Sequence, residues 1–551
     1  MGEPVSTSTL GHASEPENPP VAIPRQAWLS LVAVVFGVFV VMLDGTGLFV
    51  ANPEIATDLH AGPAGIQWVT NAYVLVLAGL MIPLGNLADR FGRKRMFLIG
   101  VGGFSLTSLL AGLSVSIGML IAVRVLQAGF GAMLIPAGMG VLRAAFPPDR
   151  LARAMGVFAA LSGVSFAAGP IIGGLLVQYA SWPWVFFINL PFGVLGVLLG
   201  MRIIKESGER ARQGFDLLGA GTLTVAVVSL IWGITQAQAA GWTSANTLVF
   251  IALGLVFGAV FVFVEAKVAN PMMPLGLFRS RTLALGSVLM VMVMFSMLSL
   301  MFFVTFLVQG VLGQSAIVTG LSMLPFSVMF AIISPFSGLL TEKFGVRKLL
   351  VLGAVLFAGG LLLMLRVNAE ARVFDLLPTF VLGGLGLGLM MVSATQAIVG
   401  SAPVEKAGVA SGIQQSMTQL GASLGTSVLG SVLATVVAGS FARNLRGAFG
   451  GRGGPAIDAL GGSEAVHKSV ELGFPPAARS GLAGQLAGTG IPRQQAEQLA
   501  AGVARAAHMT FVNGLHTVYL VGTVVILVGA ALALFIKDSE AVSNTEQTVH
   551  V

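Results

Sequence analysis

The chain has 551 residues, of which 55% are hydrophobic and only 10% are charged, and its formal net charge is +7. Soluble globular proteins carry about 25% charged residues, so this composition excludes that class. The absence of cysteine excludes disulfides, thiolate metal sites and cysteine nucleophiles. These observations point to a polytopic membrane protein.

Residues 1–24 are rich in Pro, Ser, Thr and Glu and predict a disordered cytoplasmic tail rather than a signal peptide. Apolar segments of about twenty residues follow, each long enough to cross a hydrocarbon core of roughly 30 Å. We predict spans near residues 27–48, 66–86, 96–114, 117–141, 154–178, 184–204, 217–236, 247–266, 283–308, 316–340, 348–365, 374–399, 408–438 and 511–536. The fold class is therefore an all-α polytopic membrane protein with fourteen transmembrane helices. Residues 537–551 form a second cytoplasmic tail.

The basic residues predict the orientation of these spans. An even number of spans puts both termini on one side, and short cytoplasmic loops carry an excess of Lys and Arg. Twenty of the thirty Lys and Arg residues fall in the tails and loops on the side of the termini, whereas the opposite short loops contain Arg366 and Arg372. We therefore predict a multi-pass protein of the cell membrane with both termini cytoplasmic. The positive charge reflects this topology, so no nucleic-acid partner is expected.

Segment 439–510 falls between the last two spans and is predicted to be extracellular. It is rich in Gly and Ala, and Ala496, Leu499, Ala500, Val503 and Ala507 recur in it at helical spacing. This pattern predicts a partly helical cap, and its glycines and prolines argue against tight packing. We favour a tolerated insertion, with a part of a gate as the alternative.

An internal repeat relates two bends of the chain. The bend after the second span reads Gly85-Asn-Leu-Ala-Asp89-Arg90-Phe-Gly92-Arg93-Lys94-Arg95, and the bend after the tenth reads Gly338-Leu-Leu-Thr-Glu342-Lys343-Phe-Gly345-Val-Arg347-Lys348. Such a match predicts two parallel repeats. We therefore predict a six-helix bundle at 25–204, a linker with two additional transmembrane helices at 205–281, and a second six-helix bundle at 282–536 that carries the insertion.

The first bend has the composition of a conformational latch. Gly85 lets a neighbouring helix approach closely, and Asp89 can pair with Arg90 or Arg93 or cap a helix N-terminus. We interpret Gly85, Asp89, Arg90, Gly92 and Arg93 as a latch that forms in one conformation and opens in another. The alternative is a positive-inside loop with an incidental acid.

The bend resembles the signature loop of the major facilitator superfamily. Further segments resemble its fourteen-span drug:proton antiporter branch: Leu43-Asp44-Gly-Thr46, Gln67-Trp68, Arg124-Val-Leu-Gln127, Gly163, Gly169-Pro170-Ile-Ile-Gly173-Gly174 and Asn189-Leu-Pro191. The resemblance extends from about residue 27 to 536. It implies two six-helix bundles with two extra central helices and alternating access between the bundles.

Two charged residues lie within predicted spans. Asp44 is about seventeen residues into the first span, where its charge is costly unless it is solvated or neutralised, so reversible protonation suits it. An unpaired Arg124 guanidinium inside a span is equally unfavourable, so Arg124 must face a cavity or a partner. The resemblance implies that both residues take part in proton coupling. The alternatives are an Asp44 at the outer interface, stabilised by Thr46 or Asn52, and an Arg124 that binds backbone carbonyls.

Two further groups of residues are candidates for transport. Gly169 and Gly173 form a smooth helix face beside the kink at Pro170. The resemblance implies that Gly163, Gly169, Pro170, Gly173 and Gly174 form the motif of exporters that exchange protons for substrate. For the substrate cavity we select Thr46, Gln127, Met290, Met294 and Met297, the methionines belonging to a stripe that continues to Met301. Packing is the alternative for the methionines.

Other chemistry is weakly represented. The sequence contains no Gly-Lys dipeptide and hence no Walker A loop, and Gly421-Ala-Ser423-Leu-Gly425 matches a nucleophile elbow by letter within an apolar helix. We expect no enzyme activity, cofactor or metal. The predicted function is export of amphipathic or cationic organic compounds by a monomeric proton-coupled antiporter in contact with membrane lipid. The alternatives are an exporter of one endogenous metabolite or lipid and a non-transporting receptor or scaffold.

Overall fold

The computed structural model describes residues 25–146, 158, 161, 165, 168–206, 216–268, 271, 273, 275–402, 407–449, 460–488 and 490–537. Within these ranges the regular structure is entirely helical. The predicted tail at 1–24 lies outside the described residues, and so does the predicted tail at 537–551 apart from Lys537.

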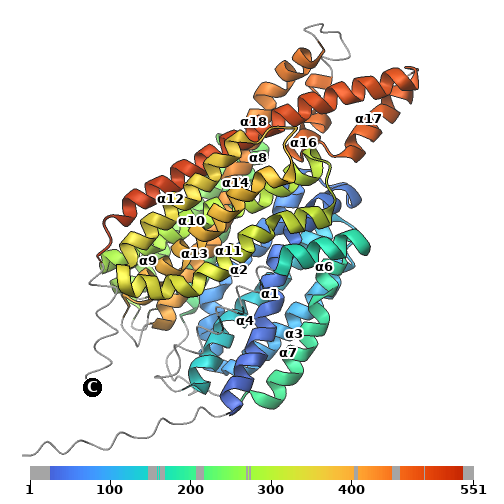
Figure 1. Ribbon diagram of the computed structural model, residues 1–551. Helices are drawn as coiled ribbons and strands as arrows, with labels where there is room; N and C mark the ends of the chain where they lie inside the picture. The colour runs from blue at the N-terminus through green and yellow to red at the C-terminus, as the bar shows by residue number, and fades with distance from the viewer. Residues whose placement is uncertain are drawn as a thin grey trace, which may run out of the picture.

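The first half of the chain forms one bundle, coloured blue to teal in Figure 1. Its helices are α1 (Arg25–Asp58), α2 (Pro63–Phe91), α3 (Arg93–Gly112), α4 (Ile117–Ala145), an unlabelled helix (Ala168–Tyr179), the short α6 (Trp184–Phe187) and α7 (Asn189–Ile203). Two accessory helices follow, α8 (Leu217–Ala240) and α9 (Ala245–Lys267). Helix α8 packs on α2, where the Thr224 hydroxyl donates to the Gly79 carbonyl at 3.0 Å.

The second half begins after the 3-10 turn η1 (Leu275–Arg279) and forms the second bundle. Its elements are α10 (Arg281–Phe306), the π-helical turn η2 (Leu307–Val311), α11 (Ala316–Phe344), α12 (Val346–Leu363), the 3-10 turns η3 (Met364–Arg366) and η4 (Val373–Leu376), α13 (Leu377–Val399), α14 (Ala407–Ala448) and α18 (Arg493–Ala533). Between the last two lie α16 (Glu464–Glu471) and α17 (Pro476–Gly488).

The predicted repeat has the same backbone at both bends. Gly92 ends α2 at φ 107°, and Gly345 ends α11 at φ 85°. Both angles lie in a region that residues with a side chain rarely adopt, so glycine is required at each bend. In each case the next helix starts at once.

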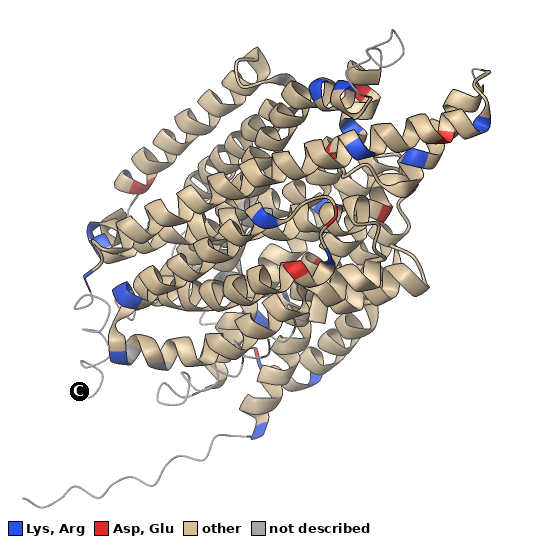
Figure 2. Ribbon diagram, turned by 45° about the horizontal axis from the view of Figure 1, so that its top comes forward, with Lys and Arg blue, Asp and Glu red and all other residues tan. Residues whose placement is uncertain are grey.

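Thirteen described helices are long and apolar enough to cross a membrane. The fifth predicted span, near 154–178, lies partly outside the described residues, and its continuous described part is the helix Ala168–Tyr179. Tan uncharged residues make up most of the bundle helices in Figure 2. The predicted all-α polytopic fold is confirmed.

The helices α16 and α17 lie at one end of the molecule, which we call the insertion end, and the start of α1 and the end of α18 lie towards the other, the termini end (Figure 1). The predicted helical stretch is confirmed, because α18 runs unbroken from Arg493 through the last span. The expectation of loose packing is wrong for α16 and the turn that follows it, whereas most residues of α17 are exposed. Val470 and Ala500 are fully buried and Phe474 is 2% exposed, because these few apolar side chains dock against the bundles.

The two halves contact each other towards the insertion end. Asn71 of α2 donates to the Ser427 hydroxyl of α14 at 2.9 Å and also binds Thr426. Gln309 of η2 donates to the Val50 carbonyl of α1 at 3.0 Å. These contacts hold the bundles together at the insertion end.

Candidate functional site

A buried ion pair lies in the middle of the first bundle. Arg124 Nη1 of α4 is 2.5 Å from Asp44 Oδ2 of α1, and the two side chains are 1% and 0% exposed. Burying either charge without its partner would be strongly unfavourable, whereas pairing offsets the desolvation cost of both charges. Asp44 is therefore not an interfacial residue stabilised by Thr46 or Asn52, and Arg124 binds a carboxylate in addition to the Val69 carbonyl at 3.4 Å.

Neutral side chains complete the shell of the carboxylate. Asp44 Oδ1 accepts from the amides of Gln127 of α4, at 3.2 Å, and Asn189 of α7, at 3.1 Å. Both amides also donate to the Ser108 hydroxyl of α3, at 2.7 and 3.2 Å. Four helices, α1, α3, α4 and α7, thus supply the Asp44 carboxylate and the side chains that surround it.

Two aromatic rings cover the guanidinium. The Arg124 Cζ lies 4.0 Å from the centre of the Tyr73 ring and 5.7 Å from that of Phe186. Such cation–π contacts stabilise a desolvated cation by up to about 2 kcal/mol. The Tyr73 hydroxyl is buried and has no hydrogen-bond partner among the described residues, so it offers a free polar group beside the ion pair.

The antiporter motif lies directly against this site. A Cβ on Gly169 would come within 1.7 Å of Thr46 Oγ1, and one on Gly173 within 2.8 Å of the Gly47 carbonyl oxygen. On its other side the same helix meets α11 of the second half, because a Cβ on Gly174 would lie 2.8 Å from the Ala316 oxygen. The helix Ala168–Tyr179 therefore connects the surroundings of Asp44 with the other bundle. Gly163 lies outside the described residues.

The latch region is held by contacts around Gly92. A Cβ on Gly85 would lie 3.1 Å from Pro136 Cβ, so α2 and α4 approach closely there. Arg93 donates to the Gly140 carbonyl at 3.1 Å, and the Glu206 carboxylate accepts from the Lys94 backbone N–H at 3.1 Å.

Glu206 thus caps the N-terminus of α3, and it also lies 3.9 Å from Arg95 Nε. Sequence reasoning missed this acid, which follows α7. The side chains of Asp89 and Arg90 lie outside the described structure, so their role as a latch stays a prediction.

The residues selected for a substrate cavity are all buried in this conformation. The exposed fractions are 5% for Thr46, 0% for Gln127, 0% for Met290, 2% for Met294 and 5% for Met297. Thr46 packs against Gly169, and Gln127 belongs to the Asp44 shell. Met294 packs against Gly421 of α14, so packing accounts for it here. A role in substrate binding stays a prediction. The elbow-like string lies within α14, as its composition indicated.

Ser108 offers a test of the shell that leaves both charges in place. In Ser108→Ala, the amides of Gln127 and Asn189 each lose an acceptor inside the bundle. Losing hydrogen bonds to buried groups costs about 1–3 kcal/mol, so we expect the melting temperature of the purified protein to fall by several degrees. Ser114→Ala, which removes a bond to the backbone of the same helix α3, is the control. Equal melting temperatures for Ser108→Ala and the unmodified protein would contradict a structural role of the shell.

Comparisons with known proteins identify the family of this chain. Residues 34–426 match the Major Facilitator Superfamily. The tetracenomycin C resistance and export protein of Streptomyces glaucescens is 41% identical over 97% of this chain and 96% of its own length. The multidrug resistance protein Stp of Mycobacterium tuberculosis is 35% identical, covering 72% and 74%. The multidrug efflux pump LfrA of Mycolicibacterium smegmatis is 32% identical, covering 72% and 79%.

Solved structures show the same fold. A bacterial homologue of the human lysosomal transporter Spinster, in an inward-facing and occupied conformation, superposes with a TM-score of 0.57 at 17% identity, over 92% of this chain and 96% of that one. The nucleoside transporter NupG gives a TM-score of 0.54 at 12% identity, covering 92% and 99%. The resemblance found in the sequence is thereby confirmed, and this chain belongs to the Major Facilitator Superfamily.

Proposed function

We propose that this protein exports amphipathic or cationic organic compounds across the cell membrane in exchange for protons. The names of three relatives at 32–41% identity, which describe resistance, export and efflux, support export of foreign compounds. The observation that carries proton coupling is the Asp44–Arg124 pair, because a transporter can use a buried carboxylate that exchanges one partner for a proton.

Protonation and bundle movement are coupled in this proposal through the helix Ala168–Tyr179. A proton on Asp44 removes its attraction for Arg124, and the α1 segment around Thr46 and Gly47 then relaxes. That segment packs on Gly169 and Gly173, while Gly174 packs on α11. A shift of α1 therefore reaches the second half through one rigid helix.

We place the insertion end outside the cell and the termini end in the cytoplasm. The charge distribution of the loops supports this orientation, since basic loops remain cytoplasmic. The contacts between Asn71 and Ser427 and between Gln309 and Val50 then close the extracellular side. The division into bundles at 25–204 and 282–536, with the linker 205–281 between them, is part of the same proposal, as are the monomeric state and the contact with lipid.

The energy of one proton is sufficient for export. Moving one charge through 100 mV supplies about 2.3 kcal/mol, which sustains roughly a fifty-fold substrate gradient. Within this proposal the substrate can be a foreign drug or an endogenous metabolite or lipid, and the residues described do not favour the second. The intramembrane ion pair argues against a scaffold, which would not need it.

The test is efflux from proteoliposomes under an imposed pH gradient, with a panel of cationic dyes, uncharged drugs and lipids. We expect proton-dependent movement of several amphipathic compounds. Movement of one endogenous metabolite alone would favour the dedicated exporter. Movement that ignores the pH gradient and the membrane potential would contradict proton coupling.

A further inference from the structure

The segment α16–α17 bridges the two halves at the insertion end. Helix α16 contacts α2 of the first half and α14 of the second, and it packs against α18. Under alternating access, α2 and α14 must separate on this side when the extracellular mouth opens. A segment that touches both must then release one of them, so α16 lies where it can restrain the opening.

The C-terminal end of α16 is fitted closely to the second half. Gly473 follows it at φ 79°, and a Cβ there would lie 2.5 Å from the Phe306 carbonyl oxygen. A Cβ on Gly310, in the π-helical turn η2, would lie 2.8 Å from the Gly473 oxygen. Phe474 adopts φ 47°, a strained conformation for an aromatic residue, while its ring is 2% exposed. The turn is therefore docked into the bundle, and π-helical turns of this type are frequent at functional sites.

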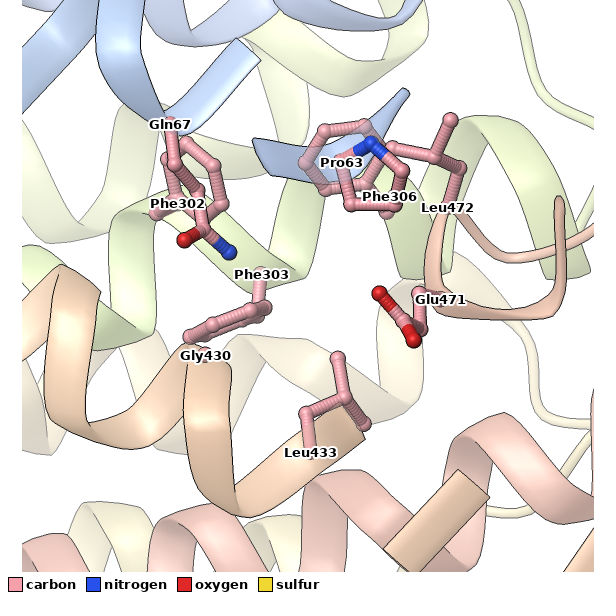
Figure 3. A pocket seen from close by; sticks show the side chains of 9 residues that line it. All are labelled: Pro63, Gln67, Phe302, Phe303, Phe306, Gly430, Leu433, Glu471 and Leu472. Carbon is pink, nitrogen blue, oxygen red and sulfur yellow. The ribbon is translucent and has the colours of Figure 1, made fainter. Parts of the chain in front are cut away.

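Glu471, the last residue of α16, points its carboxylate into a small cavity between the halves (Figure 3). The lining consists of Pro63, Gln67, Phe302, Phe303, Phe306, Gly430, Leu433, Glu471 and Leu472. Gln67 comes from α2, the three phenylalanines from α10 and Leu433 from α14. The lining is mostly apolar, so an ionised carboxylate is poorly solvated there.

Polar partners for Glu471 are few. Gln67 is 2% exposed, and its Oε1 has no hydrogen-bond partner among the described residues, so a proton donor would fit beside it. On α16 itself, the other basic residues are His467, whose Nε2 is 2.8 Å from the Gly461 carbonyl oxygen, and Lys468, whose Nζ is 2.6 Å from Glu464 Oε1. Helices α2, α10 and α14 present uncharged side chains to the cavity, and His508 of α18 is engaged with the Phe474 carbonyl at 3.2 Å.

We propose that Glu471 is a second proton-binding site, separate from Asp44, which in its protonated form holds the segment α16–α17 closed over the extracellular mouth. The proposal rests on the proposed function for the orientation of the mouth and for its opening. It assigns the insertion a working part in the gate, the alternative that the sequence disfavoured.

The direction of the pH effect follows from burial. Burial raises the pKa of Glu471 to about 7, although the positive charge of Lys468 acts to lower it. An opened mouth would hydrate the carboxylate and return its pKa towards the ordinary range near 4.3. The closed state therefore binds the proton more tightly. Closure is favoured at acidic external pH and is progressively weakened as the pH rises from about 4.3 to about 7, above which both states are ionised.

The test measures opening directly and needs no substrate. The chain has no cysteine, so spin labels on Val115→Cys and Phe374→Cys report on one exposed loop of each half at the insertion end. Pulsed electron spin resonance on protein in lipid nanodiscs, from pH 5.5 to 8.5, gives the distance between the loops. We expect a longer-distance population that grows as the pH rises towards about 7 and levels off above it. In Glu471→Gln, which mimics the protonated acid, the short distance should persist across the range.

Two matched variants control for misfolding and for the effect of other acids on the insertion. Glu471→Asp preserves titration and should preserve a pH-dependent distance, which guards against a folding defect in the glutamine variant. Glu497→Gln removes an acid that is exposed on the same insertion and bound to Arg493, and it should leave the response unchanged.

The distance measurement is repeated with Asp44→Asn, so that the titration of Asp44 cannot supply the response. Distances that ignore pH, or a pH response that Glu471→Gln leaves intact in this background, would overturn the proposal. Proton-driven efflux by the unmodified protein in liposomes would then show that the proposed function still stands.

Discussion

Asp44→Asn is expected to abolish proton-driven export while the protein still inserts and folds. Asparagine keeps nearly the same volume and one oxygen for Gln127 and Asn189, but it cannot titrate and leaves Arg124 without its counter-charge. Breaking a buried pair in this way costs about 3–5 kcal/mol in other proteins, so the purified variant should also melt at a lower temperature. The measurement is efflux from proteoliposomes under an imposed pH gradient, expected to fall to the level of protein-free liposomes.

Asp58→Asn is the matched control for this experiment. Asp58 ends the same helix α1, and its carboxylate accepts from the Trp182 indole at 2.7 Å, away from Arg124. That variant should keep most of its proton-driven export. Full pH-driven efflux by Asp44→Asn would remove Asp44 from the coupling role, whereas equal loss in both variants would point to a general defect of α1.

The sequence predicted the membrane fold well because each span can be recognised from the composition of one short continuous segment. Apolar runs of about twenty residues mark the spans. Asp44 and Arg124 were each selected because a charge in an apolar run has few explanations. Their pairing was not predicted, since the residues are 80 positions apart and no periodicity connects them.

The remaining site residues carry weaker signals. Ser108 resembles any small polar residue of a transmembrane helix, and its role appears once α3, α4 and α7 are packed together. Asn189 was noted as part of a motif, but no role was predicted for it. Glu471 was missed because seven of the nine residues that line its cavity belong to α2, α10 and α14, which are distant in sequence from the insertion. Long-range packing therefore supplies what local patterns cannot.

Gly320→Ala is expected to destabilise the closed extracellular side. A Cβ on Gly320 of α11 would lie 2.2 Å from the Pro170 carbonyl oxygen, which belongs to the backbone of the packed helix Ala168–Tyr179. A backbone atom cannot rotate aside, so the two helices must separate. Overpacking of this kind costs about 1–3 kcal/mol, which changes the ratio of closed to open protein by roughly 5-fold to 100-fold.

The same pair of spin labels at Val115 and Phe374 measures this effect, with a gain in the longer distance at every pH. Export should slow as well, because a protein held open to the outside returns to the cytoplasmic side less often. Gly258→Ala is the control, since nothing lies within 4 Å of the added methyl group. Unchanged distances and unchanged export in Gly320→Ala would mean that α11 and the Pro170 region do not separate at any step of the cycle. The coupling between Asp44 and the second bundle would then have to follow another route.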